Sequence, residues 1–477
     1  MNFCNKENYQ KIEEYISKYK EEILNDLMDL VRIPSLQGDP LENAPYGIEC
    51  DNLLKATAEL YKKKGVNSVI KNDKGYALSY FGEEKDKTIG LFSHGDVVPA
   101  DGEWLICPPF QPKEFQGHIF GRGVNDDKSG IIQAIYAVKI IEELKLPLKS
   151  NILIYTGVNE ETGMGDINAY VENEKMPDVS LVLDGEYPCY LSESGSLRFD
   201  LTAKTPFKDI KKIKGGKALN VILGEVNAEI KYNSDLYSQI KKLCSGNESF
   251  KVDADNETIY VTAFGKENHT IHIDNSVNAL MVLADMLCKC EALCDTDRKI
   301  LFNVYNLIKC GHGEGFKIDS TCDSVFCGNG IVDITEEGSL KAFFDVRCSY
   351  NADLNKMVEI IKNSISDDWN YNFIRVSPGY TKTEDDVFVQ LLSDTYSEVS
   401  GEKDVKCVRT SGGTYSRVLK NAYSIGTVGY YKAKPIDLPK GHGGVHQPDE
   451  KLNIDGFLEA LKLLVCFIME FDEKINN

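Results

Sequence analysis

The chain has 477 residues, of which 42% are hydrophobic and 27% are charged, as in ordinary globular proteins of two or three domains. Its formal net charge of −20 argues against nucleic acid as a main partner and against a basic membrane-binding surface. No stretch reaches the ~18 consecutive apolar residues of a membrane span, and the N-terminus does not resemble a signal peptide. We therefore expect a cytoplasmic protein that binds neither nucleic acid nor membranes.

The 14 cysteines are expected to be reduced thiols, because cytosolic proteins rarely keep disulfides. The closest cluster, Cys288, Cys290 and Cys294, lies in a strongly apolar stretch of helical character. It contains no pair of C-x-x-C motifs at the spacing of a zinc site. Small thiols buried in a packed helix are the interpretation that we favour for this cluster.

The first half of the chain predicts alternating helices and strands. Apolar residues recur at helical spacing near the N-terminus; they are Ile12, Tyr15, Ile16, Ile23, Leu27, Leu30 and Val31. Short apolar runs at 88–93, 151–157 and 180–183 predict strands that are covered on both faces, and residues 130–144 predict a helix with a broad apolar face. This alternation is typical of an α/β domain with a mainly parallel sheet flanked by helices.

The pattern changes near residue 190. Shorter alternating stretches at 197–203, 258–264 and 340–346, with helical runs near 275–294 and 352–366, predict an α+β domain with an antiparallel sheet. Strand and helix alternate again from about residue 386. The sequence therefore predicts one α/β domain, formed by residues 1–190 and 386–477, that is interrupted by an inserted α+β domain at 191–385.

Acidic residues and histidines follow the ends of the predicted strands. They are His94, Asp96, Asp126, Asp127, Glu160, Glu161, Asp184 and, near the other end of the chain, His446. Because ligands of open α/β sheets gather at the carboxyl ends of the strands, these segments could meet in one cleft. Imidazole and carboxylate ligands suit zinc, and less specifically manganese or cobalt. A carboxylate can bridge two ions that activate a water, and a second, free carboxylate can act as general base.

Each of these motifs has a structural alternative. The pair Asp126-Asp127 could cap the following helix, and a Glu-Glu pair is usually part of a solvated loop. Among the histidines, His118 is expected to face solvent, and His442 lies only four residues before His446 and could be mistaken for it. The occurrence of all the motifs in order, each beside a strand or a glycine-rich turn, favours a site for two divalent metal ions.

At this point the sequence resembles a known family. The segments SHGDVVP, GRGVNDDKSG, NEETG, LDGEYP and VHQPDE are similar to those of the co-catalytic zinc metallopeptidases, which include carnosinase, aminoacylase, succinyl-diaminopimelate desuccinylase and PepV-like dipeptidases. The resemblance implies one metal held by His94, Asp126 and Asp184, and a second held by Asp126, Glu161 and His446. It implies that Glu160 is the general base and that Asp96 orients His94. In this family the peptide bond equivalent to Asp126–Asp127 is often cis.

The inserted domain resembles the family more faintly. The segments around His269, Asn220 and Arg347 are similar to those that stabilise the oxyanion, contact the substrate and bind its carboxylate. His272 is the alternative to His269. Gly413 lies in a segment, SGGTYSR, that resembles a turn lining the pocket of PepV-like enzymes.

The resemblance implies hydrolysis of dipeptides or other very short peptides, with a water held between two metal ions as nucleophile. The length of the insert implies a lid that covers the chain's own active site, and therefore a monomer. Two alternatives stay open: an N-acyl amino acid deacylase, such as succinyl-diaminopimelate desuccinylase, and a non-catalytic homologue that binds peptides.

Overall fold

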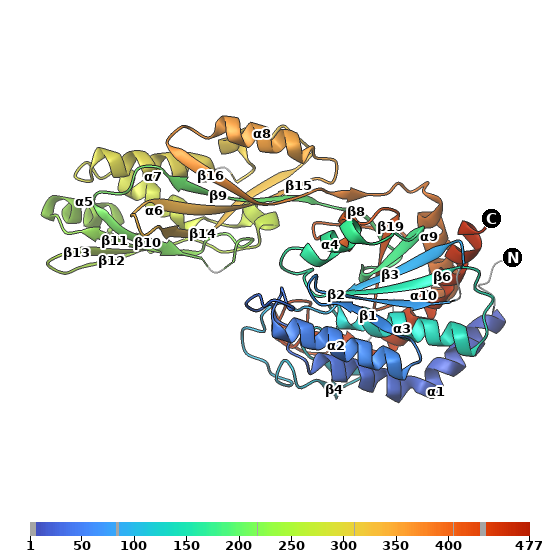
Figure 1. Cartoon of the computed structure of the whole chain (residues 1–477). Helices are drawn as coiled ribbons and strands as arrows, with labels where there is room; N and C mark the ends of the chain where they lie inside the picture. The colour runs from blue at the N-terminus through green and yellow to red at the C-terminus, as the bar shows by residue number, and fades with distance from the viewer. Residues whose placement is uncertain (1–5, 83–84, 217, 310, 404, 430–435) are drawn as a thin grey trace. The chain divides into compact units, whose positions relative to one another are not determined.

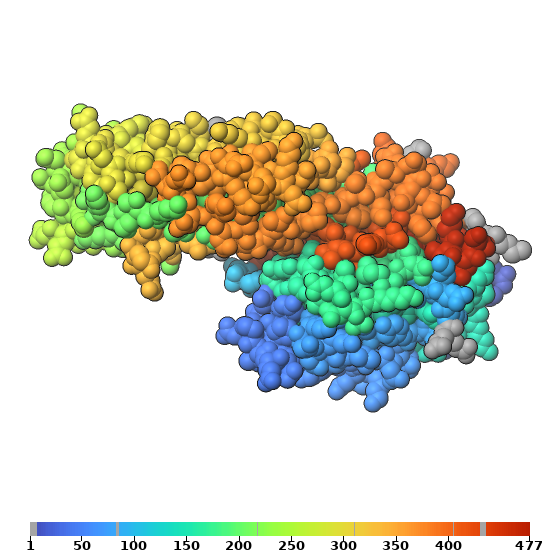
Figure 2. Space-filling model, turned by 45° about the horizontal axis from the view of Figure 1, so that its top comes forward, coloured from blue at the N-terminus to red at the C-terminus, as the bar shows by residue number. Residues whose placement is uncertain are grey.

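The computed structural model describes residues 6–82, 85–216, 218–309, 311–403, 405–429 and 436–477. The chain divides into two units. Unit 1 consists of Met1–Ser192, Lys382–Thr410 and Thr414–Asn477, and unit 2 of Glu193–Thr381 and Ser411–Gly413. Figures 1 and 2 show that unit 1 combines both ends of the chain, because its red C-terminal segment lies against blue and green N-terminal segments.

Unit 1 contains a six-stranded sheet with the order β1-β2-β6-β3-β7-β19. The strands are β1 (Ser68–Lys71), β2 (Tyr76–Phe81), β3 (Thr88–His94), β6 (Asn151–Gly157), β7 (Val179–Gly185) and β19 (Ala422–Gly426). β6, β3, β7 and β19 are parallel, whereas β1 and β2 form an antiparallel hairpin at one edge. This confirms the prediction of an α/β fold with a mainly parallel sheet.

Helices cover both faces of this sheet (Figure 1). One face packs on α1 (Lys6–Val31), α2 (Ile48–Lys63), α3 (Lys128–Glu143), α9 (Val387–Ser400) and α10 (Ile454–Ile475), and the other on α4 (Gly165–Asn173). Along β6, Ile152 and Ile154 belong to the first core, whereas Leu153 and Tyr155 belong to the second. Because successive side chains of a strand point to opposite faces, a continuous apolar run is what two covered faces require.

The structure also contains two small sheets of three strands each. β5 (His118–Phe120) pairs with β4 (Lys113–Phe115) on one side and with β20 (Lys451–Asn453) on the other, which brings residues from both ends of the chain together. β17 (Tyr380–Thr381), β8 (Tyr190–Glu193) and β18 (Val408–Thr410) form the second sheet, in that order. The chain passes between unit 1 and unit 2 at the ends of these three strands.

Unit 2 contains an eight-stranded antiparallel sheet with the order β12-β13-β11-β10-β14-β15-β9-β16. The strands are β9 (Gly195–Ala203), β10 (Ile210–Gly215), β11 (Glu225–Lys231), β12 (Phe250–Ala254), β13 (Thr258–Phe264), β14 (Val325–Ile334), β15 (Leu340–Cys348) and β16 (Trp369–Ser377). β11 alternates buried and exposed residues, as expected when one face of an antiparallel sheet meets solvent. The buried face packs on α5 (Ser234–Cys244), α6 (Ala279–Cys288), α7 (Asp295–Ile308) and α8 (Leu354–Ser364).

Two local predictions from the sequence were wrong. The helix expected near 275–294 is shorter, because Asn278 caps α6 by accepting the N–H groups of Leu280 and Met281, and α6 ends at Cys288. His118 does not face solvent: it is only 4% exposed, because β5 pairs with the distant strand β20. None of the described helices is both long and apolar enough to cross a membrane.

Candidate metal centre

The parallel strands of unit 1 place most of the predicted metal ligands at one edge of the sheet. His94 is the last residue of β3, Asp184 is near the end of β7, and Glu160 and Glu161 follow the end of β6. β3 pairs with both β6 and β7 in parallel, so the carboxyl ends of the three strands lie side by side. Asp126 joins them from the turn that precedes α3.

Asp126 lies between the two histidines. Its Oδ1 is 2.9 Å from Nε2 of His94, and its Oδ2 is 2.9 Å from Nε2 of His446. Nε2 of His94 also lies 3.8 Å from Oδ2 of Asp184, and Nε2 of His446 lies 3.0 Å from Oε1 of Glu161. The five side chains that the resemblance assigns to metal ions therefore converge in unit 1. Asp126 contacts both histidines, His94 with one carboxylate oxygen and His446 with the other.

Two buried aspartates brace this cluster through the backbone. Asp96 accepts the N–H of Glu160 at Oδ1 and the N–H of Glu161 at Oδ2, each at 3.1 Å. Its Oδ1 is also 3.4 Å from Nδ1 of His94, and its carbonyl oxygen is 3.1 Å from the same nitrogen. Asp127 accepts the N–H of His94 at 3.1 Å and caps α3; the Asp126–Asp127 peptide bond is cis. The capping alternative thus applies to Asp127 and leaves Asp126 in the cluster.

A buried ion pair that the sequence did not indicate connects distant parts of the site. Arg122 Nη1 lies 2.6 Å from Oε2 of Glu450, and each side chain is 1% exposed. Glu450 accepts the backbone N–H groups of Asn125 and Asp126, whereas Arg122 donates to the carbonyl oxygen of His446. The pair therefore holds the backbone of two predicted ligands, one from each end of the chain.

Burial and neighbouring charges shift the pKa values of this cluster strongly. Burial disfavours a charged His446, but hydrogen bonds to Asp126 and Glu161 outweigh this effect and raise the pKa of His446 to about 11. Burial raises the pKa of Glu160 to about 8 against the opposing charge of His94, and the carboxylates of Glu161 and Asp96 add to the increase. Perturbed pKa values of this kind are common at functional sites.

The donor set fits divalent cations. Potential ligand atoms within 4.8 Å of one another are provided by two overlapping groups: His94, Glu160 and Asp184, and His94, Asp126 and Glu161. Glu160 stands apart in one respect, since its buried Oε1 has no hydrogen-bond partner among the described residues. Imidazoles and carboxylates are ligands that zinc, manganese and cobalt accept.

A further acidic group in unit 2, Asp209, Cys294 and Asp297, has a structural role instead. Asp297 accepts the backbone N–H groups of Lys208, Asp209 and Ile210 at 2.8 to 3.0 Å. These hydrogen bonds occupy both carboxylate oxygens of Asp297 and hold the backbone at residues 208–210 in place. The arrangement therefore needs no metal ion to account for it.

Three of the predicted substrate residues lie together in unit 2. Asn220 Nδ2 is 3.3 Å from His269 Nε2, and the two segments are joined where the N–H of Thr270 donates to the carbonyl oxygen of Asn220 at 2.9 Å. The N–H of Ile271 donates to Nδ1 of His269. Burial, with the positive charge of Arg347, lowers the pKa of His269. Because Nδ1 accepts the N–H of Ile271, a neutral His269 carries its proton on Nε2, which requires the side-chain oxygen of Asn220, in place of its nitrogen, to face Nε2.

Arg347 shares a buried carboxylate with a second arginine. Asp345 accepts from Nε of Arg347 at Oδ2 and from Nε of Arg198 at Oδ1, both at 2.8 Å. Both arginines bind Asp345 through Nε, which leaves their terminal nitrogens for other acceptors. The sequence analysis did not identify Arg198. Arg198 lies on β9, directly opposite Asp345 on the neighbouring strand β15, and this pairing is not visible in the sequence.

The remaining predicted residues occupy different places. Gly413 lies in the short segment Ser411–Gly413, which belongs to unit 2. Nδ1 of His442 lies 2.7 Å from Oδ2 of Asp449, whereas His446 is the histidine that lies beside Asp126 and Glu161. That the unit 2 residues act on a substrate held at the cluster of unit 1 stays a prediction.

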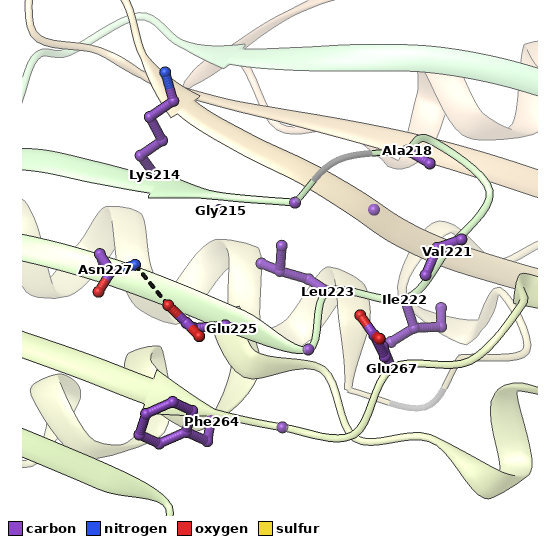
Figure 3. A pocket seen from close by; sticks show the side chains of 14 residues that line it. Lys214, Gly215, Ala218, Val221, Ile222, Leu223, Glu225, Asn227, Phe264 and Glu267 are labelled. Carbon is purple, nitrogen blue, oxygen red and sulfur yellow. Dashed lines mark hydrogen bonds between the residues drawn. The ribbon is translucent and has the colours of Figure 1, made fainter. Parts of the chain in front are cut away.

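Unit 2 also contains a pocket of about 830 Å³ beside the loop that joins β10 and β11 (Figure 3). Its lining is mostly backbone and aliphatic side chain, with the carboxylates of Glu225 and Glu267 and the ammonium group of Lys214. Asn227 donates to Glu225 at 3.0 Å. The described residues that line the pocket include neither a histidine nor a cysteine, so we assign the chemistry to the cluster in unit 1.

Comparison with known proteins agrees with this geometry. The model of Peptidase family M20/M25/M40 matches residues 90–470, and the chain belongs to this family of peptidases. It is 25% identical over 471 residues to the Bacillus subtilis protein named "Putative dipeptidase YtjP", covering 95% of this chain and 98% of that protein.

Two solved structures have a similar fold. Human carnosine dipeptidase 1 gives a TM-score of 0.59 at 16% identity, with 98% of this chain and 100% of that chain covered. The M20 family metallo-carboxypeptidase Sso-CP2 from Sulfolobus solfataricus gives 0.59 at 17% identity, with 95% and 99% covered.

Proposed function

We propose that this peptidase is a dipeptidase that depends on two divalent metal ions, zinc before manganese or cobalt. The observation that carries the proposal is the convergence of His94, Asp126 and Asp184 with Glu161 and His446. Beside them lies the buried Glu160, whose Oε1 has no hydrogen-bond partner among the described residues. His94, Asp126 and Asp184 would hold one ion, and Asp126, Glu161 and His446 the other. Two ions bound there would activate a water and polarise the scissile carbonyl.

Glu160 is the general base of this proposal. Its side chain is not needed as a ligand, because the other five residues already complete two three-residue sets. Its carboxylate would take a proton from the attacking water and pass it to the leaving amine. Burial raises the pKa of Glu160 to about 8 in the metal-free protein. Bound cations would favour the carboxylate form that a base requires.

The residues of unit 2 support a short substrate with a free carboxylate. Arg347 is the candidate that binds this carboxylate, since a guanidinium can bind it bidentately. His269, neutral and protonated on Nε2, can donate to the oxyanion that develops during attack. Gly413 and Asn220 are the further candidates for lining the substrate site. The dipeptidase names of relatives such as YtjP support the same substrate class.

The experiment that tests this proposal is a substrate panel. The chelated protein, reloaded with zinc or manganese, is incubated with dipeptides, a tripeptide, an N-acetyl amino acid and N-succinyl-diaminopimelate. We expect turnover of the dipeptides only, and loss of turnover on chelation. Turnover of the acylated substrates alone would assign the protein as an N-acyl amino acid deacylase, and binding without turnover would assign it as a non-catalytic peptide-binding homologue.

A further inference from the structure

Two cysteines that are distant in the sequence meet in unit 1. Cys189 Sγ lies 3.4 Å from Cys407 Sγ, although the residues are 218 positions apart. Cys189 directly precedes β8 and Cys407 directly precedes β18, and these strands are neighbours in their small sheet. The N–H of Val408 donates to the carbonyl oxygen of Cys189 at 3.0 Å. Backbone pairing therefore holds the two thiols together.

The two thiols have different surroundings. Cys189 is fully buried, with 0% of its surface exposed, whereas Cys407 is partly exposed. The Cys407 sulfur is also 3.4 Å from the hydroxyl of Ser393. Hydrogen bonds from Cys189 and Ser393 outweigh the effect of burial and lower the pKa of Cys407 to about 6. Cys407 is thus the thiol that an oxidant from solvent can reach. Cys189 lies close enough to react with an oxidised Cys407 and form a disulfide.

We propose that Cys189 and Cys407 form a reversible redox pair that closes to a disulfide when the protein meets hydrogen peroxide. The Cys407 thiolate attacks one peroxide oxygen, the O–O bond breaks, and protonation of the leaving oxygen gives water and a sulfenic acid on Cys407. The Cys189 sulfur then attacks the Cys407 sulfur, the S–O bond breaks, and the leaving hydroxide takes the Cys189 proton as a second water. Both thiols are oxidised by two electrons in total, and the peroxide is reduced.

The geometry requires little movement. A disulfide has an S–S distance of about 2.05 Å, so the two sulfurs need to approach by only roughly 1.4 Å more. Because β8 and β18 already pair, the backbones of the two cysteines are held beside each other while the sulfurs approach.

The disulfide between Cys189 and Cys407 would link two of the segments through which the chain passes from unit 1 to unit 2. β8 leads into unit 2 at Glu193, and β18 leads into the segment Ser411–Gly413. A disulfide between Cys189 and Cys407 would close a loop that contains Glu193–Thr381, which is nearly all of unit 2. Closing so long a loop restricts the unfolded chain and raises the melting temperature.

The test is oxidation of the folded, metal-loaded protein with hydrogen peroxide, followed by alkylation and peptide mapping. We expect a cross-linked peptide that contains Cys189 and Cys407, lost on treatment with dithiothreitol, and a higher melting temperature in the oxidised form. Cys189→Ser and Cys407→Ser should each abolish the cross-link and the shift. Cys322→Ser is the matched control, because Cys322 is a partly exposed thiol elsewhere in the chain, and it should keep both.

Two results would overturn the proposal. One is that both thiols remain alkylatable after peroxide has oxidised other residues. The other is that Cys407 proceeds to the sulfinic acid without a bond to Cys189. Neither cysteine is a proposed metal ligand, so peptide mapping gives the same answer whether or not the protein hydrolyses dipeptides.

Discussion

Arg122 and Glu450 form a buried ion pair in which Nη1 lies 2.6 Å from Oε2. The pair connects the two ends of the chain at the candidate metal centre. Glu450 accepts the N–H of Asp126, and Arg122 donates to the carbonyl oxygen of His446. Two predicted metal ligands therefore depend on one contact for the position of their backbone.

Arg122→Met is expected to destabilise unit 1, because it leaves the Glu450 carboxylate buried without its cation. Loss of one partner of a buried pair typically costs about 3–5 kcal/mol, and calorimetry of the metal-free protein would measure it. We also expect weaker metal binding by isothermal titration. Arg32→Met is the matched control, since the Arg32–Asp29 pair is 52% and 71% exposed and should cost less than about 1 kcal/mol. Equal effects of the two variants would refute the role of the pair.

Asp96→Asn is expected to weaken metal binding more than folding. The carboxylate of Asp96 accepts two backbone N–H groups, whereas an amide offers one oxygen and turns an NH₂ group toward the other donor. A roughly 10–100-fold loss of metal affinity is typical when such a supporting residue changes. Asp297→Asn provides the control, because Asp297 also accepts backbone N–H groups but lies in unit 2. Unchanged metal affinity in Asp96→Asn would contradict the prediction.

Arg347→Lys is expected to raise KM for dipeptides by roughly 10–100-fold with a smaller change in kcat, because a lysine cannot bind a carboxylate bidentately. A dipeptide amide, which lacks the carboxylate, should be a poor substrate for both the wild type and the variant. Arg198→Lys should have a smaller effect if Arg198 acts by holding Asp345. A selective loss of kcat in Arg347→Lys would argue against carboxylate binding.

The reactivity of Cys407 should show its low pKa. With a pKa of about 6, the thiolate forms as the pH rises through 6, so alkylation by iodoacetamide should reach half its maximal rate near pH 6. A free cysteine would need a pH near ~8.5. Cys189→Ala removes a hydrogen-bond donor and should move the midpoint upward. Mass spectrometry of the Cys407 peptide measures the rate, and an unshifted midpoint in Cys189→Ala would show that Cys189 does not stabilise the thiolate.

The parallel core of unit 1 could be predicted because its signal is local. The run at 151–157 is apolar on both faces, and β6 places Ile152 and Leu153 in two different cores. The candidate ligands could be located for the same reason, since each follows a strand or a glycine-rich turn. His446 needed the resemblance to a family, because no strand precedes it directly.

Other features depend on contacts that local patterns do not reveal. Arg122 and Glu450 are 328 positions apart, and neither lies in a run that indicates burial. The helix α7 was missed because it begins with the charged residues Asp295, Asp297 and Arg298, which conceal the apolar face formed by later residues. The Cys189–Cys407 contact results from the pairing of two short strands far apart in the sequence.

The most direct test of the proposed function compares Glu160→Gln with Glu161→Gln. Metal content and hydrolysis of a dipeptide are measured for each variant after reloading with zinc. We predict that Glu160→Gln keeps two ions and loses turnover by roughly 10²–10⁴-fold, whereas Glu161→Gln loses one ion together with activity. Full turnover in Glu160→Gln, or loss of its metal, would contradict the assignment of Glu160 as the general base beside a two-metal centre.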